Sequence, residues 1–383
     1  MSIKARNSPR ELFLREPLEG SGPLYGNLIH PRRPVEVTAR QRCEEMWRLF
    51  QPLADPNFHE RIPFEFHQRW FEMNLGAALV SAGLDVRAPT PGRGPDFEIL
   101  ADGRRVYIEA VCATAGDPGH ADHVAEPVYR NASGLLIAAQ VPHDRISLQI
   151  ATSVRAKLHA FDRYRVGRHV TPDDACVIAL NLRGIPHAWA EAKECFFRAV
   201  YVMGDRVLEI DPQAGEIVAA GRKHRTILTR ASGASETVAP MLDPIHSDVC
   251  AILGSSCDAW NMRTPFGDDL VLMPHANAEA PYPRGLIRRG IEITLNPAEE
   301  SGVWDVNDTD YGAPKPFGPE RFSVDYEDNT SEGEWQLSGQ ELRVRIAGRA
   351  CAVPFRIGSG DPVVAAREIA IEMIRYEKMR SRN

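Results

Sequence analysis

The sequence lacks the patterns that identify several large classes of protein. Its seven cysteines form no Cys-x-x-Cys pair, so a zinc-binding module is not expected. It contains no Walker loop and no Gly-x-Gly-x-x-Gly loop, which argues against a bound nucleotide or dinucleotide cofactor. The net charge is -7, so no overall basic field indicates nucleic-acid binding, although a local basic groove is compatible with this charge.

Signals for export or membrane insertion are also missing. Residues 1–17 contain no hydrophobic signal core, and no apolar run reaches the roughly 18 residues that span a bilayer. Several cysteines lie inside apolar runs, as Cys176 does in 175–179, which is typical of buried free thiols in a reducing compartment. We therefore expect a cytoplasmic protein without a membrane segment.

Helix and strand patterns alternate through the first half of the chain. They follow the order helix, strand, strand, helix, strand, helix, which predicts an α/β core with a central mixed sheet flanked by helices. The expected strands flank Asp102-Gly103 and recur at 176–181. The expected helices lie at about 38–53, 64–82, 145–165 and 189–202.

Three regions are expected along the chain. Residues 1–55 would form the first region, with an irregular arm over 1–35 followed by a helix. Residues 56–205 would form the core. Residues 206–383 are expected to be a strand-rich C-terminal region that packs on the core. Within it, an acidic, Gly/Pro-rich stretch at 300–340 precedes a strand pair near 341–356 and a helix at about 361–379.

Two acids flank a predicted β-hairpin in the stretch GRGPDFEILADGRRVYIEAVCATAG, residues 92–116. Asp102-Gly103 is a strong two-residue hairpin signal, because glycine tolerates the positive φ of a type I′ turn. With this turn Ile99 faces Val106, and Asp96 faces Glu109 on the same side of the hairpin. The Cβ atoms of the two acids would then be about 5 Å apart.

This pair of acids needs a physical explanation. Two like charges repel at that separation, and the apolar strand around Glu109 adds a desolvation cost. A divalent cation is the usual solution, because Mg²⁺ is commonly held by one or two carboxylates together with water and substrate phosphates. In the plainer alternative, Asp96 only starts a strand and Glu109 faces solvent on an edge strand, or a β-bulge breaks the register.

The motif Pro95-Asp96, twelve intervening residues and Glu109-Ala110-Val111 resembles the core of the PD-(D/E)XK nuclease superfamily. The element order over residues 60–205 is similar to that of the same family. The resemblance implies a restriction-endonuclease-like fold in which Asp96 and Glu109 bind Mg²⁺ or Mn²⁺ and a lysine orients the attacking water. It also implies hydrolysis of DNA and a role in restriction, anti-phage defence or repair. A homodimer is one assembly that we consider for such a protein.

The sequence departs from the family at the motif lysine, where it has Val111. A replacement is available on the next helix, whose buried face is marked by Ile146, Ile150, Val154, Leu158 and Phe161. At 100° per residue, Lys157 falls inside this apolar stripe, where a lysine is costly unless it meets an anion. We therefore predict that Lys157 replaces the missing lysine. In the alternative, its amine extends past the stripe into solvent.

The helix at 64–82 offers a third acid. Its polar arc carries Glu65, Gln68, Arg69 and Glu72. The resemblance implies a glutamate near the metal on this helix, for which Glu72 is our prediction and Glu65 the second choice. The alternative is a solvated face with an Arg69–Glu72 ion pair.

A second group of acids and histidines lies in residues 117–127, within a polar insertion at 114–144. Its spacing fits no metal site that we can name, so we expect a polar loop. The members of this group are Asp117, His120, Asp122, His123 and Glu126.

The favoured reading is a Mg²⁺-dependent deoxyribonuclease with Asp96, Glu109, Lys157 and Glu72 at its site. A rival reading is a binding module that kept the fold and lost catalysis. The reach of the Lys157 amine to the acid pair discriminates between them. A third reading is a structural protein without a metal, in which the carboxylates of Asp96 and Glu109 lie far apart or face solvent.

Overall fold

The computed structural model divides the chain into two compact units, one made of residues 1–189 and 195–311 and the other of 190–194 and 312–383. It describes residues 11–88, 94–101, 103–128, 141–201, 203–210, 213, 217–224, 227–237, 240–263, 265–287, 289–297, 304–310, 320–326, 329–338, 341–346 and 349–354. Each unit is treated separately below. In the described part of the chain, no helix is long and apolar enough to cross a membrane.

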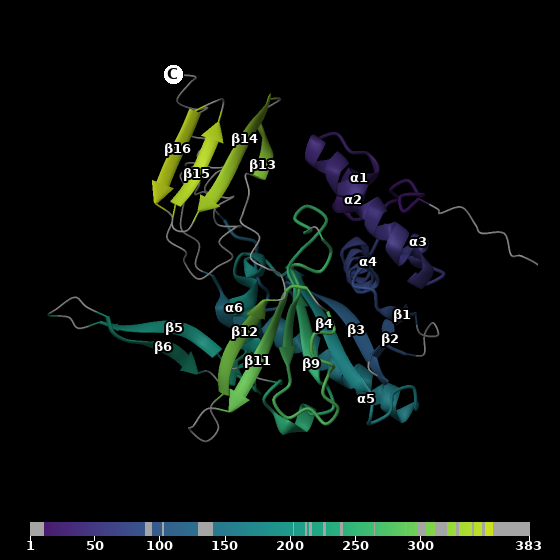
Figure 1. Ribbon diagram of the computed structural model, residues 1–383, viewed down its shortest axis with the longest axis vertical. Coiled ribbons are helices and arrows are strands. Elements are labelled where there is room, and N and C mark those ends of the chain that lie inside the picture. Colours follow the sequence, from purple (N-terminus) through teal and green to yellow (C-terminus); the bar gives the residue numbers. More distant parts are fainter. Residues whose placement is uncertain are drawn as a thin grey trace, which may run out of the picture. The chain divides into compact units, whose positions relative to one another are not determined.

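An eight-stranded mixed sheet forms the centre of the first unit, in the order β1-β2-β3-β4-β9-β10-β11-β12 (Figure 1). β3 and β4 are parallel, as are β4 and β9, while β2 is antiparallel to β3. The expected α/β class with a mixed sheet is confirmed. The strands are β1 Asp85–Arg87, β2 Phe97–Ala101, β3 Arg104–Thr114, β4 Ala175–Gly184, β9 Ala251–Ser255, β10 Val271–Pro274, β11 Ile291–Pro297 and β12 Trp304–Asp310.

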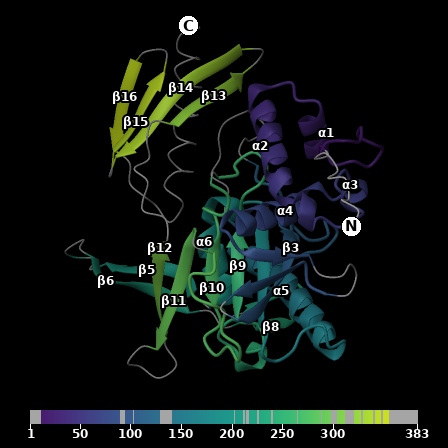
Figure 2. The same ribbon diagram turned by 45° about the vertical axis from the view of Figure 1, so that its right-hand side comes forward.

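Helices cover this sheet, with α1–α4 gathered together and α5 packed separately against it (Figure 1 and Figure 2). Proline in the first turn of α2 fixes a helical φ where no backbone donor is needed. α4 is buried around most of its circumference, as its apolar sequence predicts. The helices are α1 Pro23–Ile29, α2 Pro34–Phe50, α3 Phe58–Arg61, α4 Phe66–Ser81, α5 His143–Val166 and α6 Ala192–Val200, with 3-10 turns at Gln51–Leu53, Ala188–Glu191 and Pro244–His246.

The two faces of β3 meet different helices. Ile108 and Ala110 belong to the core cluster that also contains Trp70 and Phe71 of α4. Because side chains alternate along a strand, Glu109 points to the other face, where α5 lies. β3 therefore stands between α4 and α5.

The predicted hairpin register is confirmed over the described residues. Ala101 faces Arg104, Ile99 faces Val106 and Phe97 faces Ile108. Gly103 has a φ of 76°, which is the left-handed conformation that the turn requires. β2 begins at Phe97, so Asp96 directly precedes the strand and is the next residue in this register.

The remaining strands form smaller sheets. β5 Met203–Ile210 pairs with β6 Ile217–His224, and β7 Ile227–Thr229 pairs with β8 Ser235–Thr237. The second unit contains a four-stranded antiparallel sheet. Its strands are β13 Glu320–Tyr326, β14 Asn329–Ser338, β15 Glu341–Ile346 and β16 Arg349–Pro354.

Several expected regions differ from the observed ones. The irregular arm expected at 1–35 contains the helix α1. Its Leu12 and Tyr25 are fully buried in the core cluster, so this segment is part of the packed unit. The boundary placed at residue 205 falls inside the first unit, since β9–β12 continue the same sheet. The stretch at 300–340, for which no strand was predicted, contains β12, β13 and β14. The helix expected at 361–379 lies outside the described residues.

Candidate active site

The site lies on the edge of β3 that becomes free where β2 begins. Beyond Phe97 no strand pairs with this edge within the described residues, so its backbone groups need other partners. The carboxylate of Asp96 accepts a hydrogen bond of 2.7 Å from the backbone N–H of Ala110. Asp96 therefore takes the place of the missing strand partner and lies directly beside the residue that follows Glu109.

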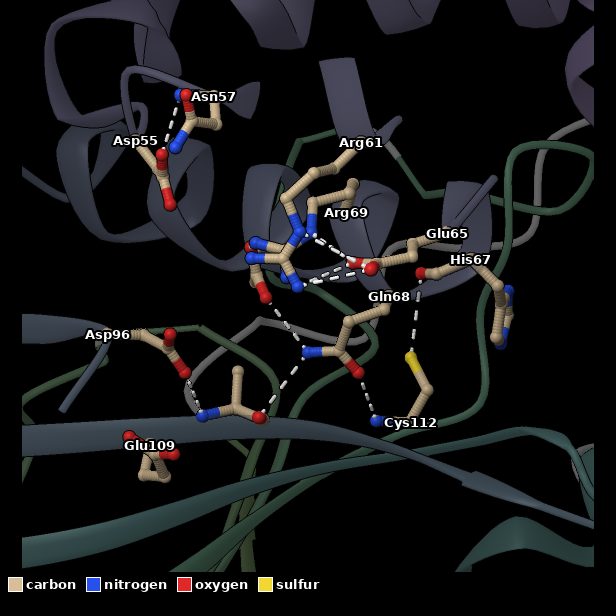
Figure 3. A network of polar contacts seen from close by, with 12 residues as sticks. Asp55, Asn57, Arg61, Glu65, His67, Gln68, Arg69, Asp96, Glu109 and Cys112 are labelled. Carbon is tan, nitrogen blue, oxygen red and sulfur yellow. Dashed lines mark hydrogen bonds and ion pairs between the residues drawn. The ribbon is translucent and has the colours of Figure 1, made fainter. Parts of the chain in front are cut away.

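Gln68 of α4 covers the next positions of the same edge (Figure 3). Its Oε1 accepts a 2.8 Å hydrogen bond from the backbone N–H of Cys112, and its Nε2 lies 3.4 Å from the carbonyl oxygen of Ala110. The thiol of Cys112 in turn contacts the carbonyl oxygen of His67 at 3.5 Å. One turn of α4 is thus attached to the β3 edge beside the acids.

Glu109 is buried, with 7% of its surface exposed, and both of its carboxylate oxygens accept hydrogen bonds from α5. The Lys157 amine donates to Oε1 at 2.8 Å, and the Tyr164 hydroxyl donates to Oε2 at 3.2 Å. The structure therefore brings Lys157 to the acid, as predicted from its place in the apolar stripe of the helix. Glu109 does not face solvent on an edge strand.

Glu72 is also buried, and it joins the site through α4. Its carboxylate accepts a 2.9 Å hydrogen bond from Gln68 Nε2 and forms an ion pair of 2.5 Å with Arg69. The Arg69–Glu72 pair considered as an alternative is present, but it is buried rather than solvated. Glu65, the second choice, is more exposed and pairs with Arg61 and Arg69.

We refer to Asp96, Glu109 and Glu72, with Lys157 and Arg69, as the acid site. Three carboxylates share two cationic groups there. Burial, together with the charges of Glu109 and Glu72, raises the pKa of Asp96 to about 8, although the Ala110 N–H and Lys157 act in the opposite direction. Burial also raises the pKa of Glu72, despite the opposing effect of Arg69. When all three carboxylates are ionised, the cluster is short of one positive charge.

The chemistry of this donor set fits a divalent cation. The described residues contain no group of three or more His, Cys, Asp or Glu side chains arranged to hold a metal ion. Mg²⁺ does not need such a group, because it commonly uses one or two carboxylates and keeps several waters. Asp96 and Glu109 can supply two carboxylates, and a bound cation would provide the charge that the cluster lacks.

Two residues of the site were not predicted from the sequence. Tyr164 follows Lys157 by seven residues, which is two helical turns and hence the same helix face, so this spacing was an available signal. Burial and the charge of Glu109 raise the pKa of Tyr164, which keeps its hydroxyl protonated and able to donate. Gln68 was placed on the polar arc of its helix, but no sequence pattern indicates that it covers a strand edge.

The other group of acids singled out in the sequence has a different arrangement. Asp122 accepts a 2.8 Å hydrogen bond from the backbone N–H of Ala231 and lies 3.7 Å from Arg230. Arg230 also pairs with the buried Glu236 at 2.7 Å, and Glu236 forms a second ion pair with Arg155 of α5. We refer to Asp122, Glu236, Arg155 and Arg230 as the loop cluster. It connects the 115–128 loop, the β7–β8 hairpin and α5.

Comparison of the chain with protein-family models, with curated proteins and with solved structures found no match.

Proposed function

We propose that the protein is a divalent-cation-dependent nuclease that hydrolyses phosphodiester bonds of DNA. The observation that carries this proposal is the 2.8 Å contact between the Lys157 amine and Glu109, beside Asp96. It supplies a lysine at the acid pair although the motif position is Val111. The proposal includes a restriction-endonuclease-like arrangement of α4, β2, β3, α5 and β4, and it takes DNA as the substrate from the resemblance of the motif.

Each residue has a role that follows from its chemistry. Asp96 and Glu109 would hold Mg²⁺ or Mn²⁺, which when bound lowers the pKa of a coordinated water and neutralises charge on the phosphate. Lys157 carries an amine with three donors, which can orient the attacking water or hold a phosphate oxygen. Glu72 fixes Arg69 and Gln68, and through Gln68 it holds α4 against the β3 edge.

The rival function is a binding module that retains the fold without catalysis. It is favoured by the valine at position 111, since a family lysine normally occupies that strand position. The contact of Lys157 with Glu109 weighs against it, because an amine is present at the acids. The third reading, with separated or exposed carboxylates, does not fit the burial of Glu109 and the place of Asp96 beside Ala110.

Cleavage of supercoiled and linear DNA tests the proposal. Wild-type protein in Mg²⁺ or Mn²⁺ is expected to cleave DNA, and chelation is expected to abolish the activity. Asp96→Asn and Glu109→Gln should each reduce the rate by about 10²- to 10⁴-fold, the range expected when several kcal/mol of charge stabilisation are lost. Asp162→Asn is the matched control, because Asp162 is an exposed carboxylate on α5.

The outcomes separate the two candidate functions. Cation-dependent cleavage that is lost in both site variants and retained in the control supports the nuclease. Binding of DNA without cleavage under any of these conditions favours the binding module. Cleavage that survives both substitutions would mean that the activity arises elsewhere and would overturn the proposal.

A further inference from the structure

Tyr164 contacts the acid site from the same face of α5 as Lys157. Its hydroxyl donates to Glu109 Oε2 at 3.2 Å, while the Lys157 amine donates to Oε1 at 2.8 Å. Each oxygen of this carboxylate thus has its own donor, and both donors come from one helix. A carboxylate held at both oxygens has a fixed plane as well as a fixed position.

This arrangement leaves acceptor positions of the Glu109 carboxylate available for a cation. An ionised carboxylate has about four acceptor positions, so two donors occupy only half of its capacity. Side chains that hydrogen-bond to metal ligands orient them, and their loss commonly weakens metal binding. The two donors on Glu109 are suited to that task, since they fix the direction of the remaining lone pairs.

The two donors differ in what they can do next. The amine of Lys157 is carried on a flexible four-carbon chain and is 21% exposed, so it can turn from Glu109 to a phosphate or a water. Tyr164 has a rigid ring placed by only two side-chain torsions, and this ring packs edge-on against Phe161 at 6.0 Å between centroids. Its hydroxyl can therefore remain on Glu109 without the lysine.

We propose that Tyr164 is a positioning residue, which holds Glu109 in a cation-binding orientation while the Lys157 amine is engaged with substrate. The inference rests on the proposed function, because it concerns how the same site binds a divalent cation. Tyr164 does not touch the reacting atoms, so it acts through Glu109.

Titration of Mn²⁺ into the DNA-free full-length protein tests the inference by isothermal calorimetry. Tyr164→Phe removes only the hydroxyl and keeps the ring that packs on Phe161. Its Mn²⁺ affinity is expected to be about tenfold weaker than that of wild type, at the lower end of the usual effect for such partners. In cleavage assays the half-saturating Mn²⁺ concentration should rise by a similar factor, with the KM for DNA unchanged.

Tyr201→Phe is the matched control. Tyr201 is a buried tyrosine of the same unit whose hydroxyl donates to the carbonyl oxygen of Pro274 at 2.6 Å, away from the acid site. This variant also loses one tyrosine hydroxyl hydrogen bond, and it should bind Mn²⁺ like wild type. If the loss of any buried hydrogen bond lowers Mn²⁺ affinity through a general effect on stability, both variants should bind Mn²⁺ more weakly by a similar factor. That result would overturn the inference.

The remaining outcomes distinguish this inference from the proposed function. If wild type binds Mn²⁺, and Asp96→Asn abolishes binding but Tyr164→Phe leaves it unchanged, only the role of Tyr164 is wrong. If wild type binds no Mn²⁺ at the acid site, the proposed function fails and the inference fails with it.

Discussion

The acid site and the loop cluster both bury carboxylates against α5, but their charges are balanced differently. In the loop cluster, Asp122 and Glu236 meet two arginines, Arg155 and Arg230. Among the described residues, the three carboxylates of the acid site have ion pairs with Lys157 and Arg69. The first cluster is neutral, whereas the second carries one uncompensated negative charge once Asp96 is ionised.

This difference in charge balance points to different roles for the two clusters. A buried acid that has its own arginine connects parts of the fold, as the loop cluster connects the 115–128 loop to the β7–β8 hairpin. A buried acid that lacks its counter-charge is unfavourable for folding and is typical of a site that binds a cation or substrate. Burial raises the pKa of Asp96 most, and the nearby charges of Glu109 and Glu72 raise it further.

The largest expected difference between the two clusters concerns catalysis. Lys157→Met should lower the rate of DNA cleavage by about 10²- to 10³-fold, the usual cost of removing a group that stabilises charge in the transition state. Arg155→Met changes a cation only two residues away on the same helix, but one that belongs to the loop cluster. Single-turnover cleavage rates of folded protein should therefore stay within about twofold of wild type in that variant. Equal losses in the two variants would remove the functional distinction between the clusters.

Replacing one acid by its neutral amide should change the free energy of unfolding in opposite directions in the two clusters. Asp96→Asn removes an uncompensated charge and should stabilise the cation-free protein at pH 8 by about 1–2 kcal/mol. Asp122→Asn leaves Arg230 without one of its partners and should destabilise the protein by about 2 kcal/mol. Urea unfolding in the presence of a chelator measures both values. Destabilisation of similar size in both variants would contradict the proposed imbalance.

The pH dependence of stability follows from Asp96. Its pKa in the folded protein is about 8, against about 3.9 for an unperturbed aspartate, so the folded state binds the extra proton. This contribution is complete below about pH 4 and is lost as the pH rises through 8. The cation-free protein should therefore lose about 2 kcal/mol between pH 5 and pH 9, a value reduced from the full shift for partial solvent screening.

Two measurements check this dependence. Asp96→Asn should flatten the decline in unfolding free energy over the same pH range. Millimolar Mg²⁺ should restore stability to wild type at pH 8 and above, because a ligand that binds only the folded state stabilises it. A slope that Asp96→Asn does not alter would assign the effect to another group.

The smallest expected difference between the two clusters concerns the glutamine beside each of them. Gln68 makes hydrogen bonds to Cys112, to Ala110 and to Glu72, while Gln149 makes one to the carbonyl oxygen of Asp122. Gln68→Met should cost about 2 kcal/mol, and Gln149→Met about 1 kcal/mol. Thermal unfolding of the two variants measures the difference, and an equal or larger loss for Gln149→Met would show that Gln68 does not hold the β3 edge.

The site was predictable from the sequence where local rules determine the geometry. The hairpin turn at Gly103 fixes the register, so the place of Asp96 opposite Glu109 follows from counting residues. Lys157 is the only lysine between residues 5 and 192, and the helical period places it on the buried face. Its contact with Glu109 follows from the cost of burying an amine without an anion.

The rest depends on contacts that no local pattern encodes. Gln68 covers the edge of a strand 42 residues further along the chain, and only the packing of α4 on β3 brings them together. Strands β9–β12 extend the core sheet across the boundary that the order of predicted elements had placed at residue 205. Sheet order is set by such long-range pairing, which sequence periodicity does not specify.

Crystals soaked with Mn²⁺ and measured at its absorption edge would test the central claim most directly. The account predicts an anomalous peak about 2.1 Å from carboxylate oxygens of Asp96 and Glu109, and none at Asp122 or Glu236. The central claim is that the acid site binds a divalent cation. An anomalous peak at the loop cluster alone, or the absence of a peak beside Asp96 and Glu109, would contradict it.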